Sequence, residues 1–402
     1  MRRMRLDKVA DQYEAFPYPA RDPADEKKRL IQGSPSNIVE IDHFLFGGQR
    51  DWSQPFRALV AGGGTGDALI QMAQVLTSAG KQFEITYLDL SSSSRKIAEE
   101  RARVRGLTGI RFVTGSLLDA PDLGPFDYID CCGVLHHLPD PDVGFSALRD
   151  ALAETGGMGI MVYAPFGRSG VYPLQDGFNA VFGHLAPNDK LVAAKKLFEK
   201  IPADHPFRAN QRVRDHNNND AGFYDLLLHS RDRAFSVPEL YDALDRAGLE
   251  LVSFLEPALY DLSRLCEVPT DMGVRQAQTA AEQLRGTMKV HVCYVAPAGS
   301  DTQPATGRKM TAVPHLGDTP VAKIADGIAR GAQPTLKLGG EKIKLDLPRE
   351  VAPLIAGVNG RRTLAEIAGA SGMDQILFGA LWKKVEAEFG NWGKLHYSRL
   401  YR

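Results

Sequence analysis

Cysteine is scarce in this chain of 402 residues, which has four: Cys131, Cys132, Cys266 and Cys293. No two of them have the spacing of zinc ligands, and neither a C-x-x-C nor an HExxH pattern occurs, so we expect no metal site. Adjacent Cys131 and Cys132 lie in an apolar stretch, where buried free thiols are expected. Such thiols suit a reducing cytoplasm, which is where we expect the protein to act.

Long apolar runs and an excess of one charge are also missing. No stretch approaches the roughly 20 apolar residues that a membrane-spanning helix needs. The basic start MRRMRLDK is not followed by the apolar segment of a signal peptide. The formal net charge is -1, whereas proteins that bind duplex nucleic acid usually carry a basic excess. We therefore expect no membrane partner, the charge balance disfavours nucleic acid, and the oligomeric state stays open.

Two patterns divide the first part of the chain. Residues 1–55 show no regular pattern, and the proline-flanked run FPYP favours extended backbone, so we expect an N-terminal arm that lies across a surface. From residue 56 short apolar strands alternate with amphipathic helices, which predicts parallel strands joined by right-handed crossovers. The expected strands are FRALVA, FEITYLDL, IRFVTG, FDYIDCCG, GIMVYAP, LELVSFLEP and MKVHVCYV.

The α/β pattern spans residues 56–296 and is interrupted at about 165–235 by a segment with several histidines and a polar run, HNNND. An insertion of this size usually forms a lid or a substrate pocket. Residues 297–334 begin with a stretch rich in Pro, Gly, Ser and Thr, which predicts a linker.

Residues 335–402 predict a small, separate α+β domain. LKLGGEKIKLDL indicates a hairpin around Gly339 and Gly340, and three helices are expected after it. The segment GRRTLAEIAGASG resembles parts of small winged-helix modules, which bind peptides, partner proteins or nucleic acid. Lys and Arg are not concentrated enough here to choose among these partners.

The segment most informative about chemistry is AGGGTGD, residues 61–67, which ends the first strand and opens a helix. Gly62, Gly64 and Gly66 allow a sharp turn and close approach of a ligand to the backbone. The dinucleotide fingerprint G-x-G-x-x-G needs a glycine at the position of Asp67, whose carboxylate would also oppose a pyrophosphate at the helix N-terminus. No Gly-Lys-Ser/Thr follows, which excludes a P-loop. The loop therefore favours a ligand without phosphate.

A carboxylate follows the second strand. Asp89 stands about twenty residues beyond the glycine loop, where an acidic side chain can accept hydrogen bonds from both hydroxyls of a bound ribose. The alternative is that Asp89 caps the helix that begins near Ser91. Because the loop and the acid occur together, we interpret Asp89, with Leu90 beside it, as part of a nucleoside site.

Together these motifs resemble the core of the class I S-adenosylmethionine-dependent methyltransferases over residues 56–165. LVAGGGTG resembles motif I, YLDLS motif II, TGSLLD motif III and FDYIDCCGVLHHL motif IV with its following segment, in the family's order and spacing. The resemblance implies a seven-stranded Rossmann-like sheet whose last strand, here MKVHVCYV, is antiparallel. It also implies S-adenosylmethionine as the cofactor. The segment LLLHSRDRAFSVPELYDALDRAGL resembles a bacterial branch whose members sometimes carry extra domains.

Two positions depart from the family pattern. Ala61 stands where many members have an acid before the first glycine, and Ser116 stands where many have an acid that binds the adenine amino group. The resemblance therefore assigns the adenine to the Ser116 hydroxyl and the Leu117 backbone amide, with Asp119 as an alternative acceptor. These substitutions affect the detailed contacts of the cofactor rather than its identity.

Candidate residues around the transferred methyl group come from three segments. His136 and His137 follow the fourth strand, at the edge where ligands bind in open α/β sheets, and His229 lies near the lid. We take His136 and His229 as candidate catalytic residues that contact the acceptor or remove its proton, with packing as the alternative. Tyr13 and Tyr18 are candidates for covering the cofactor, since aromatic rings stabilise a sulfonium; surface packing is the alternative.

The sequence thus predicts methyl transfer from S-adenosylmethionine to a small molecule or a protein side chain. An inactive cofactor-binding regulator that acts through its C-terminal domain is the alternative. A nicotinamide-dependent oxidoreductase is disfavoured by Asp67.

Overall fold

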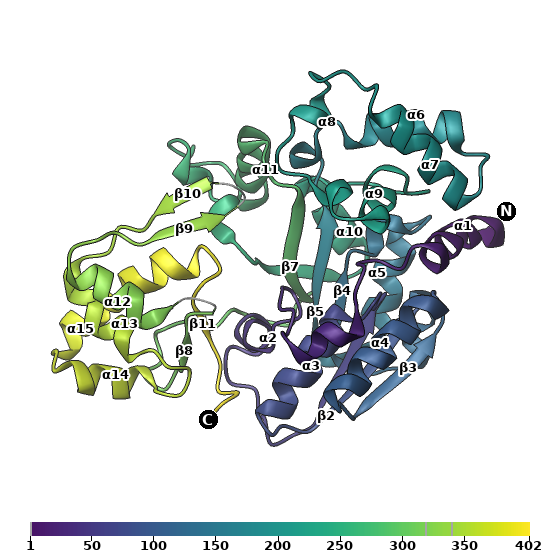
Figure 1. Cartoon of the computed structure of the whole chain (residues 1–402). Helices are drawn as coiled ribbons and strands as arrows, with labels where there is room; N and C mark the ends of the chain where they lie inside the picture. Colours follow the sequence, from purple (N-terminus) through teal and green to yellow (C-terminus); the bar gives the residue numbers. More distant parts are fainter. Residues whose placement is uncertain (1, 318–319, 339–340) are drawn as a thin grey trace.

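Seven strands form one twisted sheet in the computed structural model, which describes residues 2–317, 320–338 and 341–402 (Figure 1). Their order is β3-β2-β1-β4-β5-β7-β6. The first five run parallel, and β7 pairs antiparallel with both β5 and β6. The predicted seven-stranded α/β sheet with an antiparallel last strand is therefore confirmed. The strands are β1 (Phe56–Ala61), β2 (Phe83–Asp89), β3 (Ile110–Thr114), β4 (Phe126–Cys132), β5 (Leu152–Tyr163), β6 (Leu249–Phe254) and β7 (Val290–Pro297).

Helices cover both faces of the sheet because each central strand is apolar on both sides. In β1, Leu59 and Ala61 enter one core, whereas Ala58 and Val60 enter the other, as the two-residue period of a strand requires. The first core is closed by α5 and α10, the second by α2 and α3. The helices around the sheet are α2 (Ile38–Leu45), α3 (Asp67–Ser78), α4 (Ser92–Arg105), α5 (Pro141–Asp150), α10 (Val237–Arg246) and α11 (Val274–Arg285).

The N-terminal arm is more regular than the sequence suggests. Residues 1–55 were expected to be irregular, but they contain α1 (Arg2–Ala15), the short 3-10 helix η1 (Pro23–Lys27) and α2. The buried face of α2 escapes detection because the helix has only eight residues. The proline-rich stretch after α1 is non-helical, as expected, and lies against the sheet's carboxyl edge.

The insertion at 165–235 folds into a helical layer with its own apolar core. Its helices are α6 (Val171–Phe182), α7 (Pro187–Phe198), α8 (Pro206–Ala209) and α9 (Asp220–Leu227). Phe178, Leu191 and Leu227 are buried in that core. Figure 1 shows this layer beside α1, and the Phe16 ring stacks on Tyr224 with 4.8 Å between ring centroids. We call this layer the lid.

The C-terminal unit begins earlier than the sequence suggests. Residues 297–334 were predicted to be a linker, but they contain β8 (Pro314–His315) and α12 (Val321–Ala329), which join the core of the C-terminal residues. The composition of the preceding stretch hides this amphipathic helix. The expected hairpin strands and three helices are present, whereas the turn at Gly339 and Gly340 lies outside the described residues. The elements are β9 (Thr335–Leu338), β10 (Glu341–Lys344), α13 (Ala352–Gly357), α14 (Leu364–Ser371), α15 (Gln375–Val385) and β11 (His396–Tyr397). The winged-helix resemblance stays a prediction.

None of the described helices combines the length and the apolar character needed to cross a bilayer.

Residues near the C-terminus contact α2, which lies in the first 55 residues of the sequence. Buried Asp42 accepts hydrogen bonds from the Ser398 hydroxyl at 2.6 Å, the Trp52 indole at 3.2 Å and the Arg50 backbone N–H at 3.0 Å. Leu400 is fully buried in the core that α2 and α3 cover. A buried carboxylate needs such donors to offset its desolvation.

Replacing Ser398 by alanine tests this connection. The Ser398 hydroxyl also accepts from the Leu400 N–H at 3.1 Å. Ser398→Ala therefore removes the acceptor of the Leu400 N–H and one of the donors to the Asp42 carboxylate. We expect the free energy of unfolding to fall by roughly 1–3 kcal/mol, measured by urea denaturation. Exposed Ser78→Ala is the matched control, with an expected change within about 0.5 kcal/mol. Equal stabilities of the two variants would contradict this account.

Candidate functional site

The glycine loop between β1 and α3 is shaped by left-handed backbone. Gly62, Gly64 and Gly66 have φ angles of 76°, 50° and 100°. The Gly62 N–H donates to the Leu88 carbonyl at 2.7 Å, which pins the start of the loop to β2. A Cβ atom on Gly62 would lie 2.3 Å from Val134 Cγ2. The loop therefore needs glycine both for conformation and for space.

Asp89 joins two loops at the carboxyl edge of the sheet. Its Oδ2 accepts from the Gly64 N–H at 2.7 Å, and its Oδ1 accepts from the Ser91 N–H at 2.8 Å. Burial raises the pKa of Asp89, and these backbone hydrogen bonds oppose that rise. The helix cap itself is Ser91, whose hydroxyl accepts from the Ser94 N–H. Asp89 thus joins the glycine loop to the start of α4, at the position where the sequence predicts a ribose.

The residues predicted to contact adenine lie on neighbouring strand ends. Leu90 follows β2 and is 37% exposed. Ser116 follows β3 and caps the 3-10 helix η2 (Leu117–Asp122), with its hydroxyl accepting from the Leu118 N–H at 3.2 Å. The Asp119 carboxylate accepts from the Ser116 N–H at 3.0 Å, while Leu117 is buried. Ser116 and Asp119 therefore form a capping box beside the expected adenine position.

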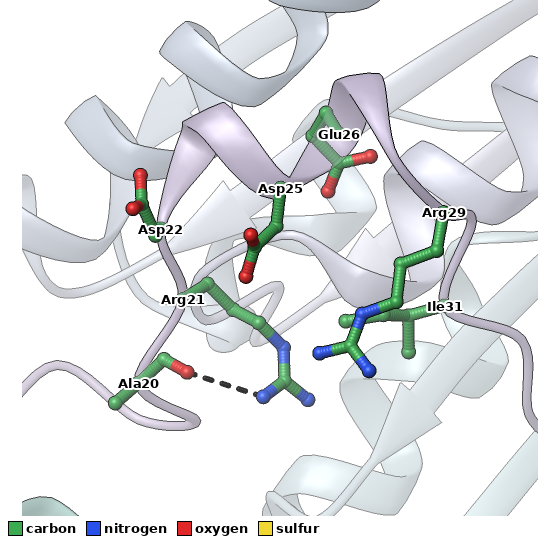
Figure 2. A pocket seen from close by; sticks show the side chains of 7 residues that line it. All are labelled: Ala20, Arg21, Asp22, Asp25, Glu26, Arg29 and Ile31. Atoms are coloured by element: carbon green, nitrogen blue, oxygen red, sulfur yellow. Dashed lines mark hydrogen bonds between the residues drawn. The ribbon is translucent and has the colours of Figure 1, made fainter.

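The structure removes the reason to expect that the Asp67 carboxylate repels a pyrophosphate. Its carboxylate forms ion pairs with Arg21 at 2.6 Å and Arg101 at 2.7 Å. Burial would raise the pKa of Asp67, but the two arginines outweigh it and lower the pKa. Two guanidinium groups compensate the charge that was expected to repel a pyrophosphate, so only the glycine spacing still disfavours a dinucleotide. Figure 2 shows the side chains of Arg21, Asp25 and Arg29 around a small pocket next to this network.

The N-terminal segment crosses the glycine loop. The Thr65 hydroxyl donates to the Pro19 carbonyl at 2.7 Å, and a Cβ on Gly64 would lie 2.9 Å from the Tyr18 carbonyl oxygen. The Glu14 carboxylate accepts from the backbone N–H of Ser92 and Ser93 at the start of α4. Residues 13–21 therefore form a strap over the edge where the cofactor is expected.

His229 and Tyr13, two predicted site residues, are in direct contact. The Tyr13 hydroxyl donates to Asp225 Oδ1 at 3.1 Å and lies 3.2 Å from His229 Nε2. The His229 ring stacks on His137, with centroids 3.8 Å apart. Burial raises the pKa of Asp225 to about 7 and holds the pKa of His229 well below its usual range. Tyr13 thus connects α1 with the lid above the end of β4.

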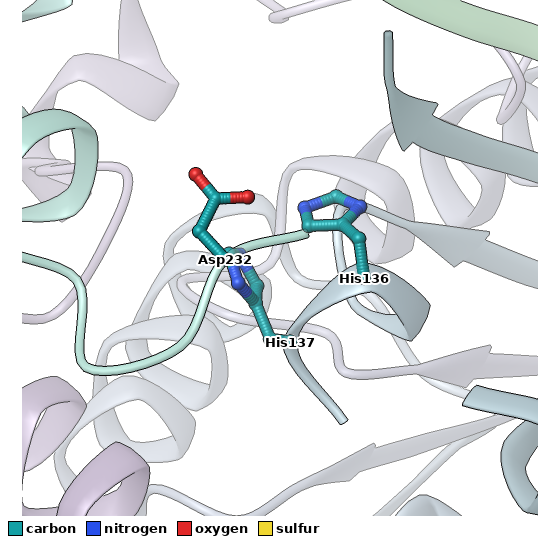
Figure 3. A group of neighbouring side chains, drawn as sticks. All are labelled: His136, His137 and Asp232. Atoms are coloured by element: carbon teal, nitrogen blue, oxygen red, sulfur yellow. The ribbon is translucent and has the colours of Figure 1, made fainter. Parts of the chain in front are cut away.

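His136 lies in the 3-10 helix η3 (Leu135–His137) directly after β4 and is fully buried. Its ring stacks on Tyr163 at 3.9 Å, and its Nδ1 accepts from the Tyr163 N–H at 3.4 Å. Asp232 of the lid approaches His136 and His137 (Figure 3) and is ion-paired with Arg168 at 2.8 Å. The structure therefore brings both predicted catalytic histidines into one cluster.

Four residues of this cluster escaped sequence reasoning: Tyr163, Arg168, Asp225 and Asp232. Asp232 stands three residues after His229 in LLHSRDR, which was the available signal. The others come from β5, the loop after it and α9, and no short motif connects these elements.

Part of the sequence is similar to those of known proteins. Residues 59–158 match the family described as "Methyltransferase domain". The chain contains a methyltransferase domain. An uncharacterised protein of Synechococcus sp. is 33% identical over 215 residues, which are 52% of this chain and 51% of that protein. The chain thus spans about half the length of this curated relative.

Further comparisons place the methyltransferase domain among similar folds. The ubiquinone/menaquinone biosynthesis C-methyltransferase UbiE of Erwinia tasmaniensis is 26% identical over 177 residues, 43% of this chain and 68% of that enzyme. The structure of PKMT2 from Rickettsia typhi has a TM-score of 0.60 at 14% identity and covers 90% of this chain and 75% of that chain. Its complex with AdoHcy has a TM-score of 0.57 at 13% identity, covering 90% and 74%. At these identities the likeness of the structures shows the fold.

Gly62→Ala tests the geometry of the glycine loop. The added methyl group meets Val134 and forces left-handed backbone on alanine, so we expect a loss of roughly 2–5 kcal/mol in the free energy of unfolding. Gly80→Ala is the matched control, because Gly80 also has a positive φ, 65°, but has open space around it. The control should lose only about 1–2 kcal/mol in the same urea titration. Equal losses would show that the contact with Val134 does not matter.

Asp225→Asn tests the buried cluster through its pH dependence. The folded protein holds the Asp225 proton with a pKa of about 7, against 3.8 ordinarily, so this group's stabilisation is complete below about pH 4 and is lost as the pH rises through 7. Relative to the parent protein, Asp225→Asn should gain stability across that interval, on the order of 1.4 kcal/mol per pH unit at most. Urea unfolding between pH 4 and 8 measures the difference. A difference that is constant with pH would refute the buried-carboxyl assignment.

Proposed function

We propose that this chain binds S-adenosylmethionine and transfers its methyl group to a small molecule or a protein side chain. The observation that carries the proposal is the pairing of the glycine loop with Asp89 inside a sequence that matches a methyltransferase domain. The structure with AdoHcy, the demethylated cofactor, belongs to PKMT2 of Rickettsia typhi, and its fold is similar to that of this chain.

The residues at the carboxyl edge fit the parts of such a cofactor. The Asp89 carboxylate suits the ribose hydroxyls, and partly exposed Leu90 offers an apolar surface for adenine. Ser116 and the Leu117 amide stand where the adenine edge would lie. Close backbone approach at Gly62 and Gly64 suits the methionine portion. The left-handed backbone of Gly62 and Gly64, which other residues rarely adopt, supports this fit.

When bound, the cofactor supplies an activated methyl group on a sulfonium. The chain then has to exclude water and hold the acceptor in line with the methyl carbon, and such positioning supplies much of the acceleration. The strap, η3 and the lid enclose the end of β4, where Tyr13, His136 and Tyr163 are buried or half-buried. Aromatic rings at this place suit a sulfonium cation.

Asp89→Ala tests the cofactor site. Loss of two hydrogen bonds to a carboxylate, each worth roughly 1.5–3 kcal/mol, should weaken binding of S-adenosylhomocysteine by on the order of 100-fold or more. Isothermal titration calorimetry measures this affinity, and near-ultraviolet circular dichroism checks that the variant is folded. Exposed Asp150→Ala is the control and should bind like the parent. Unchanged affinity in Asp89→Ala would remove Asp89 from the site.

A methyl-transfer assay separates the enzyme from the alternative of an inactive regulator. The protein is incubated with cell lysate and S-adenosylmethionine carrying a labelled methyl group. Labelled product that disappears in Asp89→Ala supports catalysis. Binding of S-adenosylhomocysteine without any labelled product would favour a regulator.

A further inference from the structure

The Tyr13 hydroxyl shows how this cluster binds a hydroxyl group. Asp225 Oδ1 accepts its proton at 3.1 Å, and His229 Nε2 lies 3.2 Å from its oxygen. The other ring nitrogen of His229 accepts from the Arg231 backbone N–H at 3.0 Å, so that nitrogen carries no proton. The proton of neutral His229 therefore sits on Nε2 and is donated to the Tyr13 oxygen. One imidazole donor and one carboxylate acceptor thus hold one hydroxyl.

The same pair of groups occurs a second time, around His136. Its Nδ1 accepts from the Tyr163 N–H, so the proton of the neutral ring sits on Nε2, as in His229. In this second group one ring nitrogen each of His136 and His137 and one carboxylate oxygen of Asp232 lie within 4.8 Å of one another. The group of His137, Asp225 and His229 meets the same limit. The two groups are therefore alike in composition and in size.

The second group differs from the first because its polar atoms lack partners. His136 Nε2 and Asp232 Oδ1 are buried without a hydrogen-bond partner among the described residues. The other oxygen of Asp232 is held by Arg168 at 2.8 Å and Gln175 at 3.0 Å, and the side chain of Asp232 is completely buried. Unpaired buried donors and acceptors are costly in a folded protein, and here one of each occurs in the same cluster, which indicates a ligand.

We propose that His136 and Asp232 bind a hydroxyl group, an alcohol or a phenol, of the methyl acceptor. A hydroxyl accepts from His136 Nε2–H and donates to Asp232 Oδ1, and one lone pair remains on its oxygen. An ammonium group has no lone pair for the His136 proton, and an ether or a ketone has no proton for Asp232. The role of the bound molecule as methyl acceptor rests on the proposed methyl transfer. The hydroxyl site itself rests on the contacts described above.

The tautomers of His136 and His229 also disfavour a metal ion at either group. A metal needs the lone pair of the nitrogen that it binds, whereas His136 Nε2 and His229 Nε2 carry protons. In the first group the Tyr13 hydroxyl already lies between the carboxylate and the imidazole. His137 has the opposite tautomer, because its Nδ1 donates to the Arg231 carbonyl at 2.8 Å. Its Nε2 is thus a second acceptor beside Asp232.

Binding of phenol and of its methyl ether, anisole, tests the hydroxyl site. Full-length protein with histidines labelled with nitrogen-15 is saturated with S-adenosylhomocysteine, and each probe is titrated while the His136 side-chain signal is followed by NMR. We expect phenol to shift this signal and to bind at least tenfold more tightly than anisole, which lacks the proton for Asp232. His136→Phe keeps the ring that stacks on Tyr163 but removes the donor, and it should weaken phenol binding about tenfold. Exposed His184→Phe is the matched control and should bind phenol like the parent.

Several results would overturn the hydroxyl site. Equal affinity for phenol and anisole, or unchanged phenol affinity in His136→Phe, would exclude it, and so would the absence of phenol binding. Cobalt(II) titration covers the metal alternative: one equivalent bound in the parent and none in His136→Phe would replace the hydroxyl by a metal. Calorimetry with S-adenosylhomocysteine on the same preparation separates the two proposals. If only the binding of S-adenosylhomocysteine is absent, the methyltransferase proposal is contradicted and the hydroxyl site is unaffected.

Discussion

The hydrogen bonds of one half-buried carboxylate organise the carboxyl edge of this sheet. Asp89 connects the Gly64 N–H in the first crossover with the Ser91 N–H in the second, so two loops from different strands share one anchor. Neighbouring parallel strands end side by side, which is why their loops can be joined by a single side chain. Left-handed backbone at the glycines then lets the loop turn without displacing Val134 or the strap. The shape of the candidate site and the position of the strap above it depend on this junction.

The strap and the lid meet over that edge through polar contacts and through the stacking of Phe16 on Tyr224. Tyr13 reaches the lid through Asp225 and His229, and Glu14 reaches the start of α4. Hydrogen bonds of this kind contribute about 1 kcal/mol each, far less than the cores of the sheet and of the lid.

Much of the fold could be predicted because the strands carry strong local patterns. The seven apolar strands, the glycine loop and Asp89 all lie where the sequence places them, since parallel strands bring their carboxyl ends together. The helices of the first 55 residues could not be predicted, because α2 is short and α1 has no clear apolar face. Helix α12 was hidden because its neighbours have the composition of a linker.

The candidate site was predictable in part for the same reason. His136 follows a strand and could be placed at the edge, but its partners depend on contacts between distant segments. Tyr13 and His229 are 216 residues apart, and no local sequence pattern predicts their hydrogen bond. Asp67 shows the converse problem: its position at a helix start was visible, whereas the two arginines that compensate it come from other elements.

The contact between the C-terminal residues and α2 has a consequence for cooperativity. Figure 1 shows the segment after β11 running beside α2, and the Ser398 hydroxyl donates to Asp42 of this helix, which lies 356 residues earlier in the sequence. The C-terminal residues cannot leave α2 without depriving a buried carboxylate of one donor and exposing Leu400. Unfolding of the C-terminal unit and unfolding of the sheet are therefore coupled.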